Sequence, residues 1–126
     1  MIEIMSYKGK EIYYLDASDQ TTQNIQEIRK DMDGIKRLIR SKPPKSALMI
    51  TNVTNARFNR EMAELFKEYA SHNTPYVKAS ALVGVSGIQK VVLTAVKTLT
   101  GRDYYLANSL EEAKEWVVNT DEQLGR

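Results

Sequence analysis

Blocks of hydrophobic residues separated by polar turns run along the whole chain and predict five strands. The strand-like blocks cover residues 2–7, 11–18, 46–53, 76–85 and 103–107. Lys8, Gly9 and Lys10 separate the first two blocks and predict an antiparallel hairpin, because glycine tolerates the positive φ of a tight turn. The block at 46–53 is interpreted as a continuous apolar run bounded by polar residues, which is typical of a strand covered on both faces.

Between these blocks, apolar residues spaced three and four apart predict four helices, because such spacing places them on one helical face. The apolar positions are Ile25, Ile28, Met32, Ile35, Leu38 and Ile39 in the first helix, Met62, Leu65, Phe66 and Tyr69 in the second, Ile88, Val91, Val92, Ala95, Val96 and Leu99 in the third, and the apolar residues of 109–118 in the last. Pro43-Pro44 ends the first helix, Asn59 caps the second and Gly101 closes the third. Ser109 and Glu112 have the spacing of a capping box at the start of the last helix.

The resulting order of elements is β-β-α-β-α-β-α-β-α. Strands that alternate with helices pair in parallel through right-handed crossovers, and the hairpin adds the first strand antiparallel. We therefore predict a single α/β domain over residues 1–126, with a mostly parallel sheet and an antiparallel N-terminal strand.

The stretch Gly84-Val85-Ser86-Gly87 joins the fourth strand to the third helix. It lacks the spacing of a phosphate-binding loop, and the residue two after Ser86 is Ile88 rather than the glycine of a nucleophile turn. We interpret the stretch as a corner in which Ser86 is the N-cap and Gln89 completes a capping box. The alternative is an anion site at the helix start, with Lys90 close by.

Composition narrows the range of functions. The chain has a net charge of +2 and one histidine. It contains no cysteine, which excludes thiolate metal sites and cysteine nucleophiles. His72 has no visible partner and is interpreted as an exposed residue at the end of the second helix. No apolar run approaches the ~20 residues that a membrane span needs. We expect a cytoplasmic, non-catalytic domain that needs no cofactor or metal.

Polar residues gather in the loops that follow the strands, at the edge of the sheet where parallel strands end, here called the carboxyl edge. The candidate binding residues there are Asn52, Thr54, Asn55, Arg57, Asn59, Ser86, Gln89, Lys90 and Asn108. Open α/β sheets bind ligands at this edge, so these residues are candidates for recognising a ligand or a partner protein. The alternative is that they are turn and cap residues chosen for backbone reasons.

A run of basic residues, with no acidic residue between them, extends from the end of the first helix into the next loop. It consists of Lys36, Arg37, Arg40, Lys42 and Lys45. These cations either complement the negative end of the helix or contact an anionic membrane surface or an acidic partner. Nucleic acid is disfavoured because no aromatic residue stands among them.

Other apolar and aromatic residues are assigned to the core. Trp116 is expected to anchor the last helix to the sheet. Met62, Leu65 and Phe66 either belong to the core or line a cavity beneath the second helix.

The stretches "ALMITNVTNARFNREMAELFKEYA" and "VKASALVGVSGIQKVVLTAVKTLTGRDYYLANSLEEAKEWV", with the opening hairpin, resemble the STAS fold and its SpoIIAA-like branch over about residues 2–118. The resemblance implies a domain that binds a partner protein and is switched by phosphorylation, for which Thr54 is the nearest hydroxyl. It also implies similarity to CRAL-TRIO lipid-transfer domains. We therefore expect a regulatory or binding domain that recognises a partner protein through the carboxyl edge. The alternative is a domain that binds a lipid or small apolar ligand under the second and third helices, with peripheral membrane association.

Overall fold

The computed structural model describes residues 1–124 and contains, within them, the predicted strands and helices in the predicted order. The strands are β1 (Ile2–Tyr7), β2 (Lys10–Asp16), β3 (Ala47–Asn52), β4 (Val77–Val83) and β5 (Tyr105–Ala107). The helices are α1 (Ile25–Arg40), α2 (Arg60–Asn73), α3 (Ile88–Thr100) and α4 (Leu110–Leu124), and a short 3₁₀ turn, η1 (Thr22–Asn24), precedes α1. The fold class predicted from the sequence is thus confirmed.

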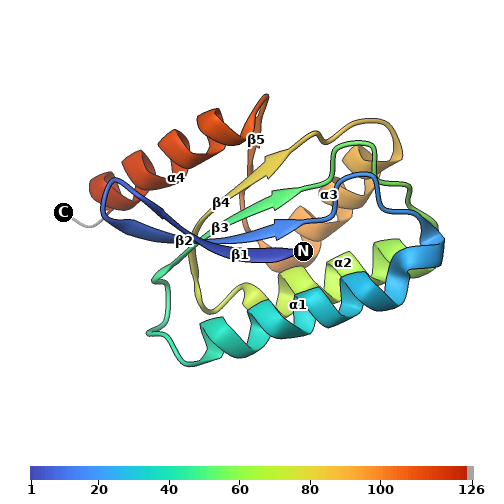
Figure 1. Ribbon diagram of the computed structural model, residues 1–126, viewed down its shortest axis with the longest axis horizontal. Coiled ribbons are helices and arrows are strands. Elements are labelled where there is room, and N and C mark those ends of the chain that lie inside the picture. The colour runs from blue at the N-terminus through green and yellow to red at the C-terminus, as the bar shows by residue number, and fades with distance from the viewer. Residues whose placement is uncertain (125–126) are drawn as a thin grey trace.

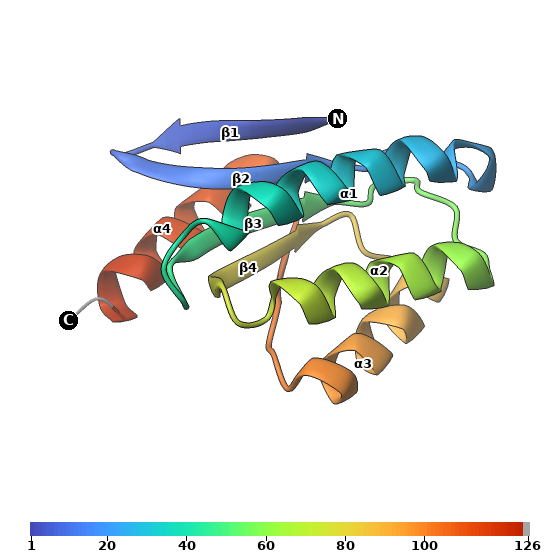
Figure 2. The ribbon, with the colours of Figure 1, turned by 90° about the horizontal axis from the view of Figure 1, so that it is seen from below.

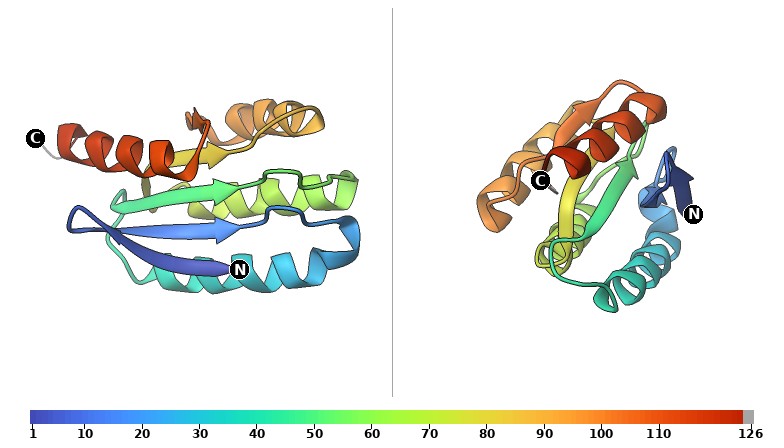
Figure 3. Two further views of the ribbon diagram at one scale, coloured as in Figure 1. Left: turned by 45° about the horizontal axis from the view of Figure 1, so that its top comes forward. Right: turned by 90° about the vertical axis from the view of Figure 1, so that its left-hand side faces the viewer.

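The strands form one sheet in the order β1-β2-β3-β4-β5 (Figure 1). β1 pairs antiparallel with β2, and the other neighbours pair in parallel. Helices α1, α2 and α3 lie side by side over one face of the sheet (Figure 2), whereas α4 lies alone on the other face (Figure 3). The loops after β2, β3, β4 and β5 therefore emerge together at the carboxyl edge, and α2 runs from that edge toward the opposite one.

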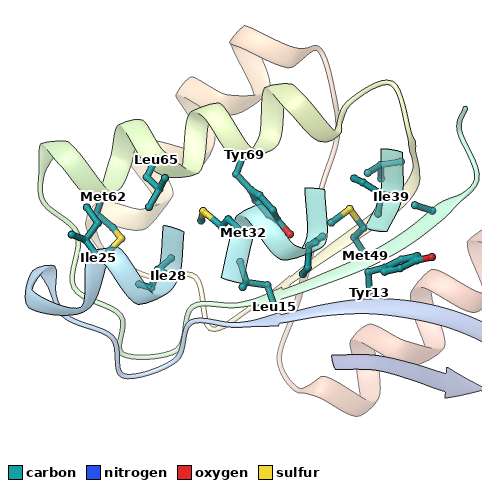
Figure 4. Packing of buried hydrophobic residues seen from close by; sticks show 13 residues of the cluster. Tyr13, Leu15, Ile25, Ile28, Met32, Ile39, Met49, Met62, Leu65 and Tyr69 are labelled. Atoms are coloured by element: carbon teal, nitrogen blue, oxygen red, sulfur yellow. The ribbon is translucent and has the colours of Figure 1, made fainter. Parts of the chain in front are cut away.

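The largest hydrophobic cluster lies between α1, α2 and the first strands (Figure 4). Met32 and Ile39 of α1 and Met62 of α2 are fully buried there against Leu15 of β2 and Met49 of β3. The spacing of three and four in both helices thus produces the buried stripe that the sequence predicts, except at Leu38 of α1, which is exposed.

The face under α4 is closely filled. Ala113, Val117 and Val118 of α4 have no exposed surface, and they pack on small strand residues such as Ala79 and Ala81. At the edge of this cluster, Trp116 stacks on Tyr105 with ring centroids 4.9 Å apart and an interplanar angle of 6°. This contact confirms the prediction that Trp116 anchors the last helix to the sheet.

Most helix ends follow the predicted capping residues. The side chain of Asn59 accepts a hydrogen bond from the backbone N–H of Met62 at 2.9 Å, and Ser109 Oγ accepts one from Glu112 N–H at 3.1 Å. Gly101 has a φ of 70° and donates its N–H to the carbonyl of Lys97, which closes α3.

The start of α3 differs from the prediction. Its N-cap is Gly87, with a φ of 55° and no side-chain cap, so the assignment of Ser86 as N-cap is wrong. The reason is that the Gln89 side chain is buried, and its Nε2 donates to the carbonyls of Val53 and Ala56 at 3.0 and 2.7 Å. Its Oε1 accepts from the Ser86 N–H at 3.2 Å, which is one half of the expected capping box.

The apolar stripe predicted for α3 is also divided. Val92, Leu93 and Val96 are buried, whereas Ile88, Val91 and Leu99 are 58%, 64% and 62% exposed. Apolar residues occupy more than half of the circumference of this helix, so spacing alone does not decide which side faces inward. Residues 88, 91, 95 and 99 form one row of the helix surface, and that row faces solvent apart from the partly buried Ala95.

Candidate functional site

A cavity lies between the sheet, α2 and α3, and we call it the chamber. It has a volume of about 70 Å³ and is partly open to solvent. Much of its wall is apolar and is formed by Phe58, Phe66, Leu82, Val85, Val92, Leu93 and Val96. A cavity needs only about 10–15 Å³ to hold one water molecule, so the chamber has room for several.

Buried polar residues converge on this chamber. Within residues 1–124, the polar residues that are less than a tenth exposed are Thr51, Asn73, Ser80 and Gln89, and all of them line it. Burying a polar group costs free energy unless it finds partners, so such residues are usually few and satisfied. Their concentration around one apolar cavity is typical of a ligand pocket.

Two further polar atoms in the wall have no hydrogen-bond partner among the described residues. They are the Tyr69 hydroxyl and Nη1 of Arg102. Tyr69 is only 5% exposed, and burial raises the pKa of its hydroxyl well above the ordinary value, so the group stays protonated. The Asn73 amide, which faces the Tyr69 oxygen without completing a well-formed hydrogen bond, lowers the same pKa more weakly, and the positive charge of Arg102 lowers it less still. The Tyr69 O–H is therefore free to donate, and Tyr69 and Arg102 line the same cavity.

The rest of the Arg102 guanidinium is held in place by its neighbours. Its Nε donates to the Tyr104 hydroxyl at 3.0 Å, and the guanidinium carbon lies 4.7 Å from the centre of the Tyr104 ring. A longer contact of 3.5 Å joins Nη2 to Ser80 Oγ. No acidic side chain within residues 1–124 forms an ion pair with Arg102.

The two polar atoms without a partner lie at one end of the chamber, here called the polar end, whereas the buried Thr51 and Gln89 lie nearer the carboxyl edge, where the Gln89 amide is already bound to backbone carbonyls. Tyr69 and Asn73 belong to the last turns of α2, and Arg102 precedes β5, so these groups lie away from the carboxyl edge. Phe58 and Val85 come from the loops of the carboxyl edge and close the opposite end. This distribution of free polar atoms and apolar side chains suits a molecule with a polar head and an apolar body.

Several predicted binding residues of the carboxyl edge are instead used inside the protein. Asn52 Oδ1 accepts from both the N–H and the hydroxyl of Thr54, at 3.0 and 2.7 Å. Asn59 caps α2, and Gln89 binds backbone groups. Asn108 is exposed and contacts the Glu112 carboxylate at 3.4 Å.

The remaining residues of this edge present exposed side chains. Arg57, Ser86 and Lys90 are exposed, and Asn55 is exposed with its Nδ2 3.3 Å from Asp19 Oδ1. The structure thus brings the predicted residues to one edge but leaves only some of them free for an external partner.

Thr54 packs tightly against the corner after β4. A Cβ atom added at Gly84, whose φ is 81°, would lie 2.1 Å from Thr54 Oγ1 and 2.6 Å from Thr54 Cα. Glycine is therefore required at position 84 both for the turn and for this close approach. The Thr54 hydroxyl, hydrogen-bonded to Asn52 in this corner, has little room for a phosphoryl group, whereas Ser86 is exposed.

The basic run lies apart from the chamber. Arg37, Arg40 and Lys42 are exposed at the C-terminal end of α1, which is separated from α3 by α2 (Figure 2). Lys36 pairs with Glu68 at 2.8 Å, and Lys45 Nζ donates to the carbonyl of Thr74 at 2.9 Å. Two members of the run are thus engaged within the protein.

Of the two alternatives predicted for Met62, Leu65 and Phe66, both occur, and the prediction about His72 needs correction. Of the residues considered for a cavity wall, Phe66 lines the chamber, whereas Met62 and Leu65 lie in the cluster beneath α1 (Figure 4). Helix α2 packs against α1 on one side and against α3 on the other. Its apolar residues therefore divide between the core cluster and the chamber. His72 is half-buried rather than exposed, with Nδ1 3.0 Å from Asn73 Oδ1.

The sequence pattern did not identify Asn73, Ser80 or Arg102 as site residues, and it predicted Tyr69 only as part of the packing face of the second helix. One signal was present: no acidic residue stands between Glu68 and Asp103. Another was Ser80, which interrupts the apolar block of the fourth strand. Neither signal identifies a cavity, because the polar groups come from three different elements that meet only in the folded chain.

Residues 1–124 contain neither a cluster of metal ligands nor a helix that could span a membrane. No group of histidine, aspartate and glutamate side chains there is arranged to hold a metal ion. No helix in that range combines the length and the apolar character needed to cross a membrane.

Comparison with known proteins identifies the fold. No protein-family model matches the chain, and neither does any curated protein. A crystal structure of an uncharacterized protein from the DUF3478 family, from Shewanella loihica PV-4 and described as having a SpoIIAA-like fold, matches with a TM-score of 0.67. The match covers 93% of this chain and 92% of that chain.

The chain has a SpoIIAA-like fold. This confirms the resemblance noted in the sequence. At 13% identity the likeness extends to the fold alone.

Proposed function

We propose that this SpoIIAA-like domain binds a small, largely apolar ligand in the chamber. The observation that carries the proposal is the convergence of buried polar residues and two unpartnered polar atoms on one apolar cavity. Ligand pockets combine apolar walls with a few polar groups that fix orientation. Unpartnered buried polar atoms cost stability, and a ligand that supplies their hydrogen bonds would recover that cost.

The size of the chamber implies that α3 moves when the ligand enters. Its volume of about 70 Å³ is smaller than the ~150 Å³ cavity that accommodates benzene in an engineered protein. Helix α3 is held mainly by α2, through a small cluster formed by Ala70, Val92 and Val96. A modest outward shift of α3 would enlarge the chamber without disturbing the cluster beneath α1.

The test uses two neighbouring valines of α3. Val92 lines the chamber, whereas Val91 is 64% exposed, so Val92→Phe fills the chamber and Val91→Phe is the matched control. Each protein is purified from cells and its native mass is measured before and after extraction with organic solvent. We expect an extractable extra mass on the wild type and on Val91→Phe, and a bare mass for Val92→Phe. Equal loading of both variants would contradict the proposal.

A second candidate, recognition of a partner protein at the carboxyl edge, rests on a different observation. A shallow groove there is lined by Arg57, Ser86 and Ile88, and Ile88 is 58% exposed beside the exposed Lys90. Cations around an apolar side chain suit an acidic segment that also carries apolar residues. If this surface binds such a partner, Arg57→Glu will abolish capture of the partner, and Arg37→Glu on α1 will leave it unchanged.

A further inference from the structure

The two unpartnered groups in the chamber wall differ from the other polar groups there because both are free to donate. The Tyr69 hydroxyl stays protonated, and Nη1 of Arg102 carries its hydrogens permanently. No aspartate or glutamate among the described residues lines the chamber. What the polar end lacks is therefore a negatively charged acceptor for these two donors.

Charge leads to the same conclusion. Arg102 is half-buried, and no acidic residue within 1–124 is paired with it. A cation withdrawn from water is costly unless an opposite charge accompanies it. A ligand that carries a negative charge to this point would supply that counter-charge, and its hydrogen bonds would be charge-assisted.

The single guanidinium of Arg102 determines how many negative charges the ligand can carry. One cation balances a monoanion, whereas a dianionic phosphate would leave a second charge in an apolar cavity. A carboxylate also presents acceptor oxygens to two donors from different elements, as Tyr69 of α2 and Arg102 before β5 require.

We propose that the ligand of this chamber is a monocarboxylate with an apolar body, whose carboxylate is bound by Arg102 and Tyr69 while the body extends toward Phe58 and Val85. This inference rests on the function proposed above and adds the chemical class of the ligand. Neither residue acts on the ligand chemically; both fix its orientation.

Three probes of the same length test the class of ligand: octanoate, octanol and octylammonium. Each is titrated into the wild-type protein while backbone amide NMR signals are followed. We expect octanoate to bind at least about tenfold more tightly than octanol, and octylammonium to give no saturable binding, because the polar end offers donors and positive charge.

Two variants assign the effect to residues. Tyr69→Phe removes a hydroxyl that has no partner, so octanoate affinity should fall about threefold to tenfold while octanol affinity and the melting temperature are maintained. Arg102→Gln should lower octanoate affinity at least about tenfold and bring it to the level of octanol. Arg60→Gln, which removes an exposed cation in the first turn of α2, is the control and should leave octanoate affinity unchanged.

The outcomes separate this inference from the proposed function. If octanol binds the wild type as tightly as octanoate and Val92→Phe prevents both, the chamber binds ligands but the carboxylate assignment is wrong. If neither compound binds at millimolar concentration, both the carboxylate assignment and the proposed function are overturned. Unchanged octanoate affinity in both Tyr69→Phe and Arg102→Gln would overturn the assignment of the polar end.

Discussion

The two faces of the sheet are built from similar elements but are filled differently. Under α4, alanine and valine side chains from helix and strands meet without exposed surface, as at Ala113 and Val117. Under α2 and α3, the wall includes buried polar residues, and a cavity of about 70 Å³ is left. Three buried side-chain atoms within residues 1–124 have no hydrogen-bond partner: Tyr69 Oη and Arg102 Nη1 belong to this second face, and Gln20 Oε1 lies in the loop after β2.

The difference shows where this fold departs from maximal stability. Dense packing and satisfied polar groups are what a stable domain requires on both sides of its sheet. The α4 face meets this requirement, whereas the face that contains the chamber does not. Departures of this kind are expected at functional sites, because a site must leave interactions for its ligand.

The largest expected effect on the free energy of unfolding comes from replacing an alanine by leucine on each face of the sheet. Ala113 under α4 has no exposed surface, and Ala70 lines the chamber. Ala113→Leu overfills a dense region and should lower the free energy of unfolding by about 3 kcal/mol. Ala70→Leu has space to occupy and should change it by less than about 1 kcal/mol. Urea unfolding of both variants measures the difference, and equal losses would show that the two faces are packed alike.

Removing the Gln89 side chain should have the next largest effect. Its amide joins the start of α3 to the carbonyls of Val53 and Ala56. Gln89→Ala leaves these buried groups without that partner, so stability should fall by about 2 kcal/mol and amide exchange should accelerate at the start of α3. Lys90→Ala, at the exposed neighbouring position, is the control. Similar exchange in both variants would mean that Gln89 does not anchor α3.

An ion pair on the α4 face predicts a dependence of stability on pH. Hydrogen bonds from Lys78 and then Lys10 hold the pKa of Asp121 below its ordinary value. A carboxylate whose pKa is lowered by folding stabilises the protein above its unfolded pKa of about 3.9, and the contribution is lost as pH falls through the lower folded value. Asp121→Asn should therefore cost about 1 kcal/mol at pH 7 and progressively less as the pH falls below the unfolded pKa of about 3.9. A cost that stays constant from pH 7 to pH 2 would exclude this ion pair as its source.

The smallest expected effect compares two buried tyrosines. Tyr14, on the α4 face, has a hydroxyl that accepts from Asn52 Nδ2 at 3.1 Å, whereas the Tyr69 hydroxyl has no partner in the described chain. Tyr14→Phe should lower the free energy of unfolding by about 1 kcal/mol, and Tyr69→Phe should leave it unchanged or raise it slightly. Thermal and urea unfolding measure both. A larger loss for Tyr69→Phe would indicate that its hydroxyl already has a structural role.

The sequence predicted the fold far better than the site. Glycine at hairpin and helix ends, Asn59 as a cap and the stripe of α1 act locally, so their pattern is readable along the chain. The chamber depends on which side of α3 turns inward, and a helix with apolar residues around most of its surface does not specify that. Arg102 and Tyr69 line the same cavity only because the elements that carry them pack together. No spacing in the sequence links the two residues.

The most direct test of the chamber as the binding site is the map of backbone amide NMR changes on adding octanoate to the wild-type protein. We predict changes in α2, in α3, in the ends of β3 and β4 beneath them and in residues 102–104, with α4 unaffected. Changes centred on α4 or on the basic end of α1, or no changes at millimolar octanoate, would contradict it.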